Sequence, residues 1–475
     1  MSIPKIIHQL WIGPKPMPEK LMNTWREKHP DYTYIRWTEC EIQKRNLKLE
    51  CSNEIDRMTE INGKADIIRW EILYQYGGIF IDADSICLEP FDDSFLNRTA
   101  FAGFENEECR KGLVATGTMG FIKNHPLCRA AIDWILNNDS CPYTCKQRAW
   151  YTVGPGLLTR LLETGNYKNF CVYPSYMFLP LHFTGIEYTG HKKVYAFQEW
   201  GSTKQNYDSM NNNFILPKQF TEPETWVSVL VTSYNTKHIY VIECLESIKS
   251  QNGHFGIELV WINDGSDDLS TKLLENELEK FKKNTRFTKL IYKKNENNLG
   301  VAESLHNGIY MCSNEIIIRM DSDDVMTPER IQKQINFINS KSDCNICGAN
   351  VQMFIKDYDS GNKNMQLLQK TDHKTITFND FKENKSTWIM NHPTICFRKS
   401  AIINIGNYNK DLTRSCLEDY DLELRFLKKY GIIYNIDEVL LYYRIHENQV
   451  TWYGKSSSNE NNELRNKLIE KILEE

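Results

Sequence analysis

The chain lacks any apolar run of the ~18–20 residues that a helix needs to cross a bilayer. Its first residues also lack the charged head and long apolar stretch of a secretory signal. Its 57 lysines and arginines are outnumbered by 62 aspartates and glutamates, so the basic excess typical of nucleic-acid-binding proteins is missing. We therefore expect a soluble cytoplasmic protein that binds no nucleic acid and reaches a membrane only through a partner.

The cysteines, 14 in all, form no repeating framework. Cys344 and Cys347 are spaced as a CxxC pair, and Cys141 and Cys145 lie four apart. Neither pair has the nearby histidine or second cysteine pair that a zinc site requires. Reduced thiols in or near the core are a better interpretation than a metal or redox centre.

The length of the chain, 475 residues, is too great for one hydrophobic core of the usual size. Residues 204–213 are polar and show no periodicity, and Pro217 and Pro223 follow before an apolar segment begins at Trp226. This pattern is typical of an interdomain linker. The predicted organisation is a first domain over 1–203, a linker over 204–224 and a second domain over 225–475.

Apolar strands and amphipathic helices alternate in the second half of the chain. The expected strands are 227–232, 258–262, 289–292 and 315–320, and the expected helices are 239–250, 270–281, 300–312 and 328–339. Continuous apolar strands separated by such helices predict a mostly parallel sheet covered on both faces. Ligands bind beyond the carboxyl ends of the strands in sheets of this kind.

Polar clusters follow these strands. They occupy 232–235, 263–268, 298–302 and 321–324. Asp264 can accept hydrogen bonds from a base or ribose, and a helix beginning near Gly300 can present its N-terminus to a diphosphate. Asp321 and Asp323 can turn toward one ligand, and Mg²⁺ or Mn²⁺ suits such carboxylates together with diphosphate oxygens. One cluster alone would be ordinary turn chemistry, but four in order predict a nucleotide-sugar site.

Residues 227–450 resemble glycosyltransferase family 2, the inverting enzymes of the GT-A fold. The matching segments are 227–235, 263–268, 298–302, 320–328, 417–421 and 443–446. The resemblance covers nearly the whole second half of the chain, and the combination of segments is specific.

This resemblance implies a role for several side chains. Asp264 contacts the nucleotide base, Asp321 the ribose and Asp323 the metal. Asn235, the last residue of the first matching segment, also binds the donor. Asp419 is implied to be the general base that deprotonates the acceptor hydroxyl for in-line attack at the anomeric carbon.

Other polar residues of the second half have structural interpretations too. Glu418 and Asp419 form an acidic first turn on an expected helix, which the helix dipole favours and which is compatible with the catalytic role. His392, Arg444 and His446 either line the diphosphate or simply pack.

The first half carries its own acidic motif. Strands are expected at 5–12, 32–37 and 79–81, with a helix at 64–76. Asp66 and Arg69 share one face of that helix, and their spacing alone favours a surface ion pair. The helix stops at a Gly-Gly pair, and the following strand runs straight into Asp82 and Asp84. This arrangement predicts that all four side chains lie near one another.

The first half resembles glycosyltransferase family 32 and its relatives with an Asp-x-Asp sugar-binding region, a retaining GT-A group of capsular-polysaccharide and mannosyltransferase type. The matching parts are 3–13, Trp25, Pro30, Trp37, 65–84, 116–120 and 154–156. The resemblance implies that Asp66, Arg69 and Asp82 hold the nucleotide sugar and that Asp84 binds the metal.

One segment departs from that family. Its members often carry a His-His-Trp or His-x-Trp segment near the metal, where this chain has Gln198 and Glu199 before Trp200. Glu199 or the nearby His191 is the expected substitute. The tryptophans Trp11, Trp37, Trp70 and Trp150 either stack on nucleotide or sugar or belong to the core.

The expected fold class is α/β, with two GT-A-type domains of Rossmann-like character in tandem. The expected function is a bifunctional, metal-dependent glycosyltransferase of polysaccharide biosynthesis, retaining in its first domain and inverting in its second. Its partners would be UDP- or GDP-sugar donors, Mn²⁺ or Mg²⁺, and a glycan or glycoconjugate acceptor. Fusion of the two domains would keep the first product near the second site.

Three alternatives stay open. The second domain alone is active while the first only binds nucleotide or acceptor, as the Gln198-Glu199 departure suggests. A sugar nucleotidylyltransferase would need a Gly-rich basic loop after the first strand, and residues 232–237 contain no glycine. A non-catalytic carbohydrate-binding protein would leave the paired carboxylates unexplained.

Overall fold

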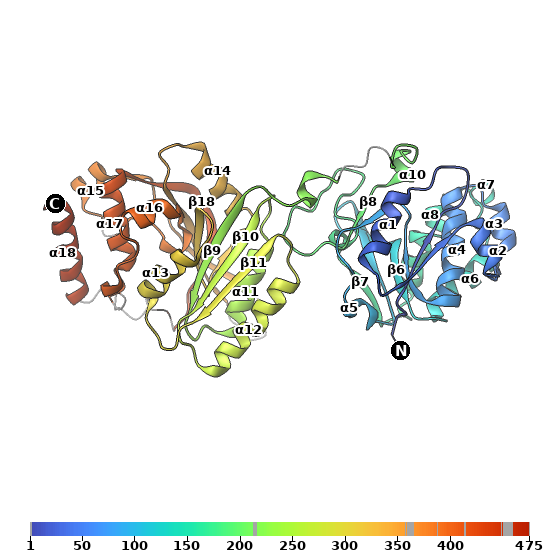
Figure 1. Cartoon of the computed structure of the whole chain (residues 1–475), viewed down its shortest axis with the longest axis horizontal. Helices are drawn as coiled ribbons and strands as arrows, with labels where there is room; N and C mark the ends of the chain where they lie inside the picture. Colours follow the sequence, from blue (N-terminus) through green and yellow to red (C-terminus); the bar gives the residue numbers. More distant parts are fainter. Residues whose placement is uncertain are drawn as a thin grey trace. The chain divides into compact units, whose positions relative to one another are not determined.

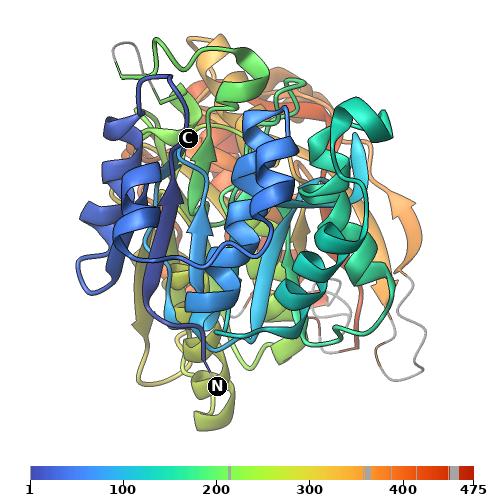
Figure 2. The same ribbon diagram turned by 90° about the vertical axis from the view of Figure 1, so that its right-hand side faces the viewer.

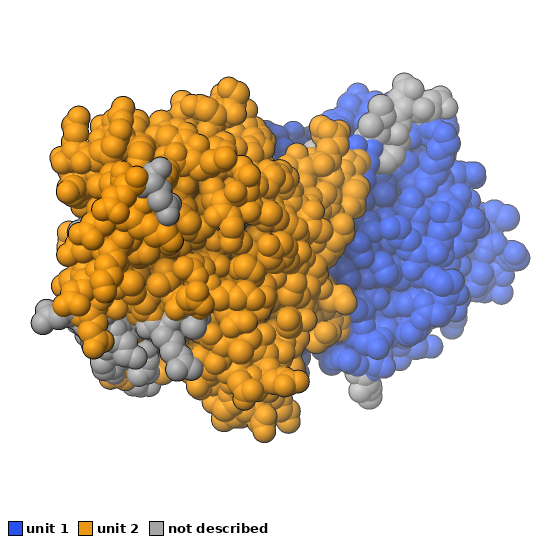
Figure 3. Space-filling view, turned by 60° about the vertical axis from the view of Figure 1, so that its left-hand side comes forward, with its two compact units in different colours: residues 1–188, 193–216 blue, residues 189–192, 217–475 orange. Residues whose placement is uncertain are grey.

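The structure, a computed structural model, describes residues 2–211, 216–356, 358, 365–386, 388–412, 415–447, 449 and 459–474. The chain divides into two compact units (Figure 3). Unit 1 consists of Met1–Tyr188 and Lys193–Leu216, and unit 2 of Thr189–Lys192 and Pro217–Glu475. No helix among the described residues has the length and apolar character that a membrane span requires.

The main sheet of unit 1 combines parallel and antiparallel strands. Its strand order is β2 (Thr33–Trp37), β1 (Ile6–Leu10), β3 (Gly78–Ile81), β6 (Arg110–Phe121), β5 (Ala100–Asn106) and β7 (Phe170–Tyr173). Strand β1 is parallel to β2 and β3, whereas β6 is antiparallel to both β3 and β5. A second sheet pairs β4 (Ser85–Cys87) with β8 (Ala196–Gln198). The three strands predicted in this half correspond to β1, β2 and β3.

Helices pack on both faces of this sheet, and Figure 2 shows helices of unit 1 in front of its blue and cyan strands. They are α1 (Glu19–Lys28), α2 (Glu39–Lys44), α3 (Ser52–Arg57), α4 (Ile61–Tyr76), α5 (Asp93–Leu96), α6 (Pro126–Asn137), α7 (Pro142–Cys145), α8 (Ala149–Thr152), α9 (Pro155–Glu163), the 3₁₀ turn η1 (Ser175–Met177) and α10 (Gly201–Lys204). Side chains alternate along a strand. Phe80 therefore packs with α4, α6 and α9, while Ile79 and Ile81 pack with α1 and α5.

A Gly-Gly turn connects α4 to β3. Gly77 has φ 66° and Gly78 has φ 97°. A Cβ atom at Gly77 would lie 2.5 Å from the Lys123 backbone nitrogen, and one at Gly78 would lie 2.7 Å from the Ile6 carbonyl oxygen. Both positions therefore require glycine, for backbone conformation and for space. The turn sends the chain into the buried strand that ends at Asp82.

The large sheet of unit 2 begins with parallel strands and becomes mixed. Its order is β11 (Thr288–Lys294), β10 (Gly256–Asn263), β9 (Trp226–Ser233), β12 (Ile316–Asp321), β17 (Cys396–Arg398), β14 (Ile346–Lys356), β18 (Ile432–Arg444) and β13 (Val325–Met326), with β15 (Met365–Lys370) on β14 and β16 (Ile376–Thr377) on β18. Strands β9 to β12 run parallel, and β17 is antiparallel to β12. The prediction of a mostly parallel sheet is therefore right for these four strands. Beyond β12 the sheet is mixed, because β17 is antiparallel to both β12 and β14, whereas β14 and β18 are parallel to each other.

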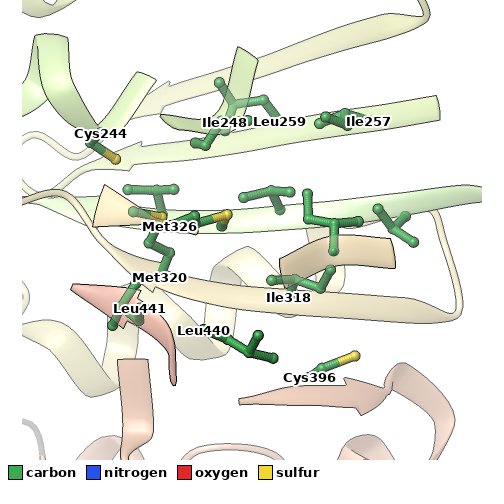
Figure 4. Packing of buried hydrophobic residues seen from close by; sticks show 14 of the residues in the cluster. Cys244, Ile248, Ile257, Leu259, Ile318, Met320, Met326, Cys396, Leu440 and Leu441 are labelled. Carbon is green, nitrogen blue, oxygen red and sulfur yellow. The ribbon is translucent and has the colours of Figure 1, made fainter. Parts of the chain in front are cut away.

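Helices cover this sheet on both faces, as predicted. They are α11 (His238–Lys249), α12 (Asp268–Lys283), α13 (Val301–Met311), α14 (Arg330–Ser340), α15 (Phe378–Asn384), α16 (Lys399–Asn404), α17 (Glu418–Tyr430) and α18 (Asn459–Glu474), with 3₁₀ turns η2 (Lys218–Phe220), η3 (His392–Thr394) and η4 (Lys410–Leu412). Figure 1 shows β9, β10 and β11 side by side. Val229 and Val231 pack toward α11, α12 and α14, whereas Leu230 packs toward α13 and α17. Figure 4 shows part of the first of these cores, with Leu259 close to Ile248.

The segment predicted as a linker, 204–224, packs at both ends. Tyr207 lies edge-on to Trp11, with ring centroids 5.1 Å apart, and Asn211 Nδ2 donates to the Met17 carbonyl oxygen (2.6 Å), both within unit 1. In unit 2 the side chain of Phe220 is buried. Because Thr189–Lys192 also belongs to unit 2, the chain passes between the units more than once.

Candidate functional site

Asp66, Arg69 and Asp82 meet where β3 ends. The Arg69 guanidinium contacts Asp66 Oδ1 at 3.0 Å and Asp82 Oδ1 at 2.5 Å. Its Nη1 also donates to the Thr116 carbonyl oxygen (2.6 Å). The Arg69 and Asp66 side chains are only 6% and 9% exposed, so the surface-ion-pair interpretation is wrong. The Asp82 side chain, 30% exposed, gives the cluster its open side.

Two glycines bring backbone against these carboxylates. A Cβ atom at Gly154 would lie 2.4 Å from Asp66 Oδ2, and one at Gly117 would lie 2.9 Å from Asp82 Oδ2. The segments 116–120 and 154–156 therefore border the cluster. Burial raises the pKa of Asp66 to about 6, although the adjacent Arg69 charge opposes the rise.

Asp84 lies beside this cluster with both carboxylate oxygens engaged. Gln198 Nε2 donates to Oδ1 (2.5 Å), and the Gly201 backbone N–H donates to Oδ2 (2.6 Å). Burial, together with the charge of Asp82, raises the pKa of Asp84 to about 7. Gln198, at the position where the sequence departs from the family pattern, thus donates a hydrogen bond to Asp84, the carboxylate predicted to bind the metal.

Of the two expected substitutes for the missing histidine, Glu199 adjoins Asp84, because its backbone N–H donates to the Asp84 carbonyl oxygen (3.0 Å), whereas His191 lies elsewhere. Glu199 Oε2 lies 3.7 Å from Lys204 Nζ. His191 belongs to unit 2, where its ring nitrogens lie 2.9 and 2.7 Å from the carbonyl oxygens of Gln251 and Phe255. The expectation that His191 serves the metal of the first half is therefore wrong, because its ring is buried in the other unit.

In unit 2, Asp264 organises the loop before α13. Its Oδ1 accepts hydrogen bonds from Asn295 Nδ2 (2.8 Å) and the Leu299 N–H (2.9 Å), and its Oδ2 accepts from the Gly300 N–H (2.8 Å). The helix N-terminus expected to face a diphosphate therefore faces this buried carboxylate. A negative charge at that position stabilises the helix.

Asn235 joins the loops that follow β9 and β10. Its backbone N–H donates to Ser266 Oγ (2.9 Å), and its Oδ1 accepts from the Asp267 N–H (2.9 Å). It adopts φ 49°, a conformation that asparagine tolerates better than most residues. Its side chain is exposed at the strand ends.

Asp321 forms a bidentate ion pair with Arg319. The guanidinium nitrogens lie 2.8 Å from Asp321 Oδ2 and 2.5 Å from Oδ1. Sequence reasoning missed Arg319, although residues two apart on a strand share a face. An arginine among the isoleucines of β12 was the signal that could have found it. Burial raises the pKa of Asp321, and the Arg319 charge opposes that rise.

The first turn of α17 presents Glu418 and Asp419 near this pair. Burial raises the pKa of Asp419, whereas its hydrogen bond from the Tyr420 N–H and the charge of Arg319 lower it. The charge of Asp419 also raises the pKa of Asp321, less than burial does. The structure thus brings the predicted general base into the electrostatic field of the predicted ribose ligand.

Glu418→Gln is expected to make the stability of unit 2 less sensitive to pH. Burial, and then the charge of Asp419, raise the pKa of Glu418 to about 8 from 4.5. The folded state therefore holds this proton more tightly than the unfolded state does. Wild-type stability falls as the pH rises from 4.5, the ordinary pKa, to about 8, the pKa in the folded state. Urea midpoints should match at about pH 4, below both pKa values, and favour the variant at about pH 9. An equal gap at both pH values would contradict the buried proton.

Asp323 contacts His446, which follows β18 in the chain. His446 Nε2 lies 2.8 Å from Asp323 Oδ2, and both side chains are partly exposed. Arg444 is fully buried, donates through Nε to the Asp323 carbonyl oxygen (2.6 Å) and pairs through Nη2 with Glu243 (2.6 Å). The sequence left open whether Arg444 and His446 line the diphosphate or pack. Arg444 packs and positions Asp323, whereas His446 lies at the predicted metal site.

His392 is a packing residue of the same unit. Its Nε2 lies 2.7 Å from Tyr408 Oη, and burial holds its pKa well below the ordinary histidine value.

Within the described ranges, no group of three or more histidine, cysteine, aspartate or glutamate side chains is arranged as a metal site. Trp37 and Trp70 are fully buried in the core of unit 1, which excludes them from stacking on a ligand.

Comparison with known sequences identifies two regions. Residues 228–406 match Glycosyl transferase family 2, and residues 18–102 match the glycosyltransferase sugar-binding region containing a DXD motif. The second region contains Asp66, Arg69, Asp82 and Asp84. Both predicted resemblances are confirmed, and with the strand orders of the two units they confirm the predicted α/β, GT-A-type fold class.

Individual relatives match one half of the chain each. Amylovoran biosynthesis glycosyltransferase AmsE from Erwinia amylovora is 30% identical over 224 residues, 47% of this chain and 77% of that protein. Inositol phosphoceramide mannosyltransferase 3 from Schizosaccharomyces pombe is 32% identical over 136 residues, 26% of this chain and 35% of that protein.

Among solved structures, the mannosyltransferase PcManGT from Pyrobaculum calidifontis in complex with GDP-Man and Mn²⁺ is 14% identical with a TM-score of 0.37. The match covers 49% of this chain and 60% of that one. The family 2 match and the amylovoran relative place this protein by sequence: the chain belongs to the glycosyltransferases, with a family 2 region preceded by a DXD-containing sugar-binding region.

Proposed function

We propose that the chain is a bifunctional glycosyltransferase with one catalytic domain in residues 1–203 and another in 225–475. The observation that carries this proposal is the same arrangement in both units. In each, a strand ends in an Asp-x-Asp motif whose first carboxylate pairs with an arginine: Asp82 with Arg69, and Asp321 with Arg319. In each, the second aspartate contacts a polar side chain from a distant segment.

In the first domain, Asp66, Arg69 and Asp82 hold the nucleotide sugar. The exposed side of Asp82 lies at the carboxyl end of the parallel strands β1 and β3, where ligands of such sheets bind. Asp84 is the proposed metal residue, but its side chain is buried and each of its carboxylate oxygens already accepts a hydrogen bond, from Gln198 and from Gly201. A divalent ion therefore fits this domain best through Asp82, with Asp84 adjoining.

In the second domain, Asp321 binds the ribose and Asp323 the metal, with Asn235 and Asp264 shaping the loops around the nucleotide. The partly exposed Asp323 carboxylate is a suitable ligand for Mn²⁺ or Mg²⁺, and the His446 imidazole beside it favours Mn²⁺ over Mg²⁺, which prefers oxygen ligands. When bound, the ion neutralises charge on the departing nucleoside diphosphate. Arg444 holds the Asp323 backbone in place for this contact.

Asp419 supplies the base of an inverting reaction. Its carboxylate takes the proton of the acceptor hydroxyl while that oxygen attacks the anomeric carbon from the side opposite the leaving nucleotide. Burial raises the pKa of Asp419, which brings the group nearer to the operating pH, where a general base is most effective. We propose a retaining reaction for the first domain, in keeping with its sequence resemblance.

A donor screen with paired variants tests the proposal. The protein is incubated with UDP-, GDP- and TDP-sugars and Mn²⁺ or Mg²⁺, and release of nucleoside diphosphate is measured. We expect Asp82→Ala/Asp84→Ala and Asp321→Ala/Asp323→Ala each to abolish turnover of a different donor, because each removes one domain's carboxylates. Chelation should abolish both activities.

The second candidate is a single active domain. The hydrogen bond from Gln198 to the buried Asp84 carboxylate favours it, because Gln198 occupies the place of a metal-binding histidine. In that case the first double variant would keep every activity and the second would lose all of them. Turnover of no donor with any acceptor would contradict both candidates.

A further inference from the structure

A row of aromatic side chains lies in unit 1 beside the carboxylate cluster, with an arginine inserted in it. Arg110 Cζ lies 5.0 Å from the Trp150 ring centroid and 5.6 Å from the Phe183 centroid. The Phe183 and Trp200 centroids are 5.2 Å apart. We call these four side chains the aromatic row. The proposed donor site uses none of them.

Buried polar contacts hold the row in place. Arg110 Nε lies 3.3 Å from Glu105 Oε1, and Glu105 is buried against His182. Trp200 Nε1 donates to the Leu181 carbonyl oxygen (2.8 Å). Trp150 nevertheless remains 37% exposed with Arg110 against it. An exposed tryptophan ring thus lies against an arginine that the buried Glu105 holds, and such ordered neighbours lower the entropy cost of binding a ligand there.

Both ends of the row adjoin the carboxylates. The Cβ position built on Gly154 lies 2.4 Å from Asp66 Oδ2 and 3.3 Å from Trp150 Cα, so this tryptophan is a neighbour of Asp66. At the other end, Trp200 directly precedes Gly201, whose N–H donates to Asp84. The backbone at Trp150 and at Trp200 therefore adjoins Asp66 and Asp84, which places both ends of the row next to the cluster.

Strand direction separates the row from the nucleotide. The nucleotide belongs at the carboxyl ends of the parallel strands β2, β1 and β3. Arg110 begins β6, which is antiparallel to β3 and continues past the end of β3, because Thr118 is already paired with Ile81. The row thus lies on the antiparallel side of the Asp-x-Asp motif, opposite the strands that would hold the donor.

We propose that the aromatic row is the acceptor subsite of the first domain and binds a pyranose ring of the glycan acceptor. This inference rests on the proposed function of that domain. A pyranose has a face of C–H groups that packs on aromatic rings, and hydroxyls around its edge that accept hydrogen bonds from a guanidinium. Trp150 and Phe183 offer the rings, and Arg110 between them offers the donors.

The test measures sugar binding without requiring turnover. Saturation-transfer NMR is recorded on the full chain with both methyl anomers of glucose, galactose, mannose and N-acetylglucosamine, each with UDP or GDP and the diamagnetic ion Mg²⁺. We expect at least one glycoside to bind the wild type and to bind Trp150→Ala about tenfold more weakly, because a stacking surface is lost. Trp150→Phe should retain most of the binding. Tyr143→Ala, which removes an exposed aromatic from α7 outside the row, should retain all of it.

Two results would overturn the inference. One is that no glycoside gives a signal that depends on Trp150. The other is that Trp150→Ala weakens UDP or GDP binding, which would make the row part of the donor site. Nucleotide binding is measured separately, in the Asp321→Ala/Asp323→Ala background that removes the second donor site. If it is unaffected there by Asp82→Ala/Asp84→Ala, the proposed function of the first domain is contradicted.

Discussion

Asp419→Asn is expected to reduce the turnover of the second transfer about 10²–10⁴-fold, the range that a lost general base produces. Asparagine keeps the size of the side chain and an oxygen that can accept the Tyr420 N–H, so the first turn of α17 should stay folded. It cannot take the acceptor proton. Donor affinity should be unchanged, because Asp321 and its partner Arg319 stay intact.

Steady-state kinetics with saturating donor and calorimetric donor binding separate these effects. Asp421→Asn is the matched control, since Asp421 lies on the same helix but pairs with Arg425 (2.6 Å). It should change turnover little. If Asp419→Asn retained turnover within about threefold, another group would have to act as the base.

Arg69→Met is expected to destabilise unit 1 by about 3–5 kcal/mol, because it leaves buried carboxylates without their counter-charge. Arg69 is buried between Asp66 and Asp82, and its guanidinium also packs over the Phe80 ring at 4.6 Å. The variant should also lose the first transfer. Methionine fills a similar volume, so the loss of charge dominates the effect.

Hydrogen exchange in peptides from α4 measures this change locally, which matters because two units can unfold in separate transitions. Arg129→Met is the control: Arg129 also contacts two carboxylates, Glu50 and Asp133, but on the surface, where the expected cost is about 1 kcal/mol or less. Adding Asp82→Asn to Arg69→Met should recover part of the loss. Equal losses of unfolding free energy in the two arginine variants would show that burial does not strengthen the ion pairs of Arg69 with Asp66 and Asp82.

Local patterns in the sequence predicted much of the fold. The helix at 64–76, its Gly-Gly end and the following strand correspond to α4 and β3, because the helical spacing of apolar residues and positive-φ glycines act within a few residues. In unit 2 the strands β9 to β12 and the helices between them were predicted for the same reason. Strands β14, β17 and β18 were not, because their pairing joins segments far apart in the chain.

The candidate site, like the fold, was predicted from the sequence only in part. The acidic residues themselves were identified from the sequence, since each follows a strand end. Their partners were not: Asp323 meets His446 across 123 residues, and Asp84 meets Gln198 across 114. Asp264 was expected to face a ligand, yet the structure turns it onto the Gly300 N–H.

The sequence by itself determined that this chain has two α/β halves, each ending a buried strand in an Asp-x-Asp motif, because strand period and turn chemistry are short-range properties. Only the tertiary structure decided which side chains surround those motifs. It buried Trp70 and left Trp150 exposed beside Asp66, and it placed His191 in the other unit. The physical reason is that burial and partner choice depend on which distant segments pack together, and residue type alone does not specify that packing.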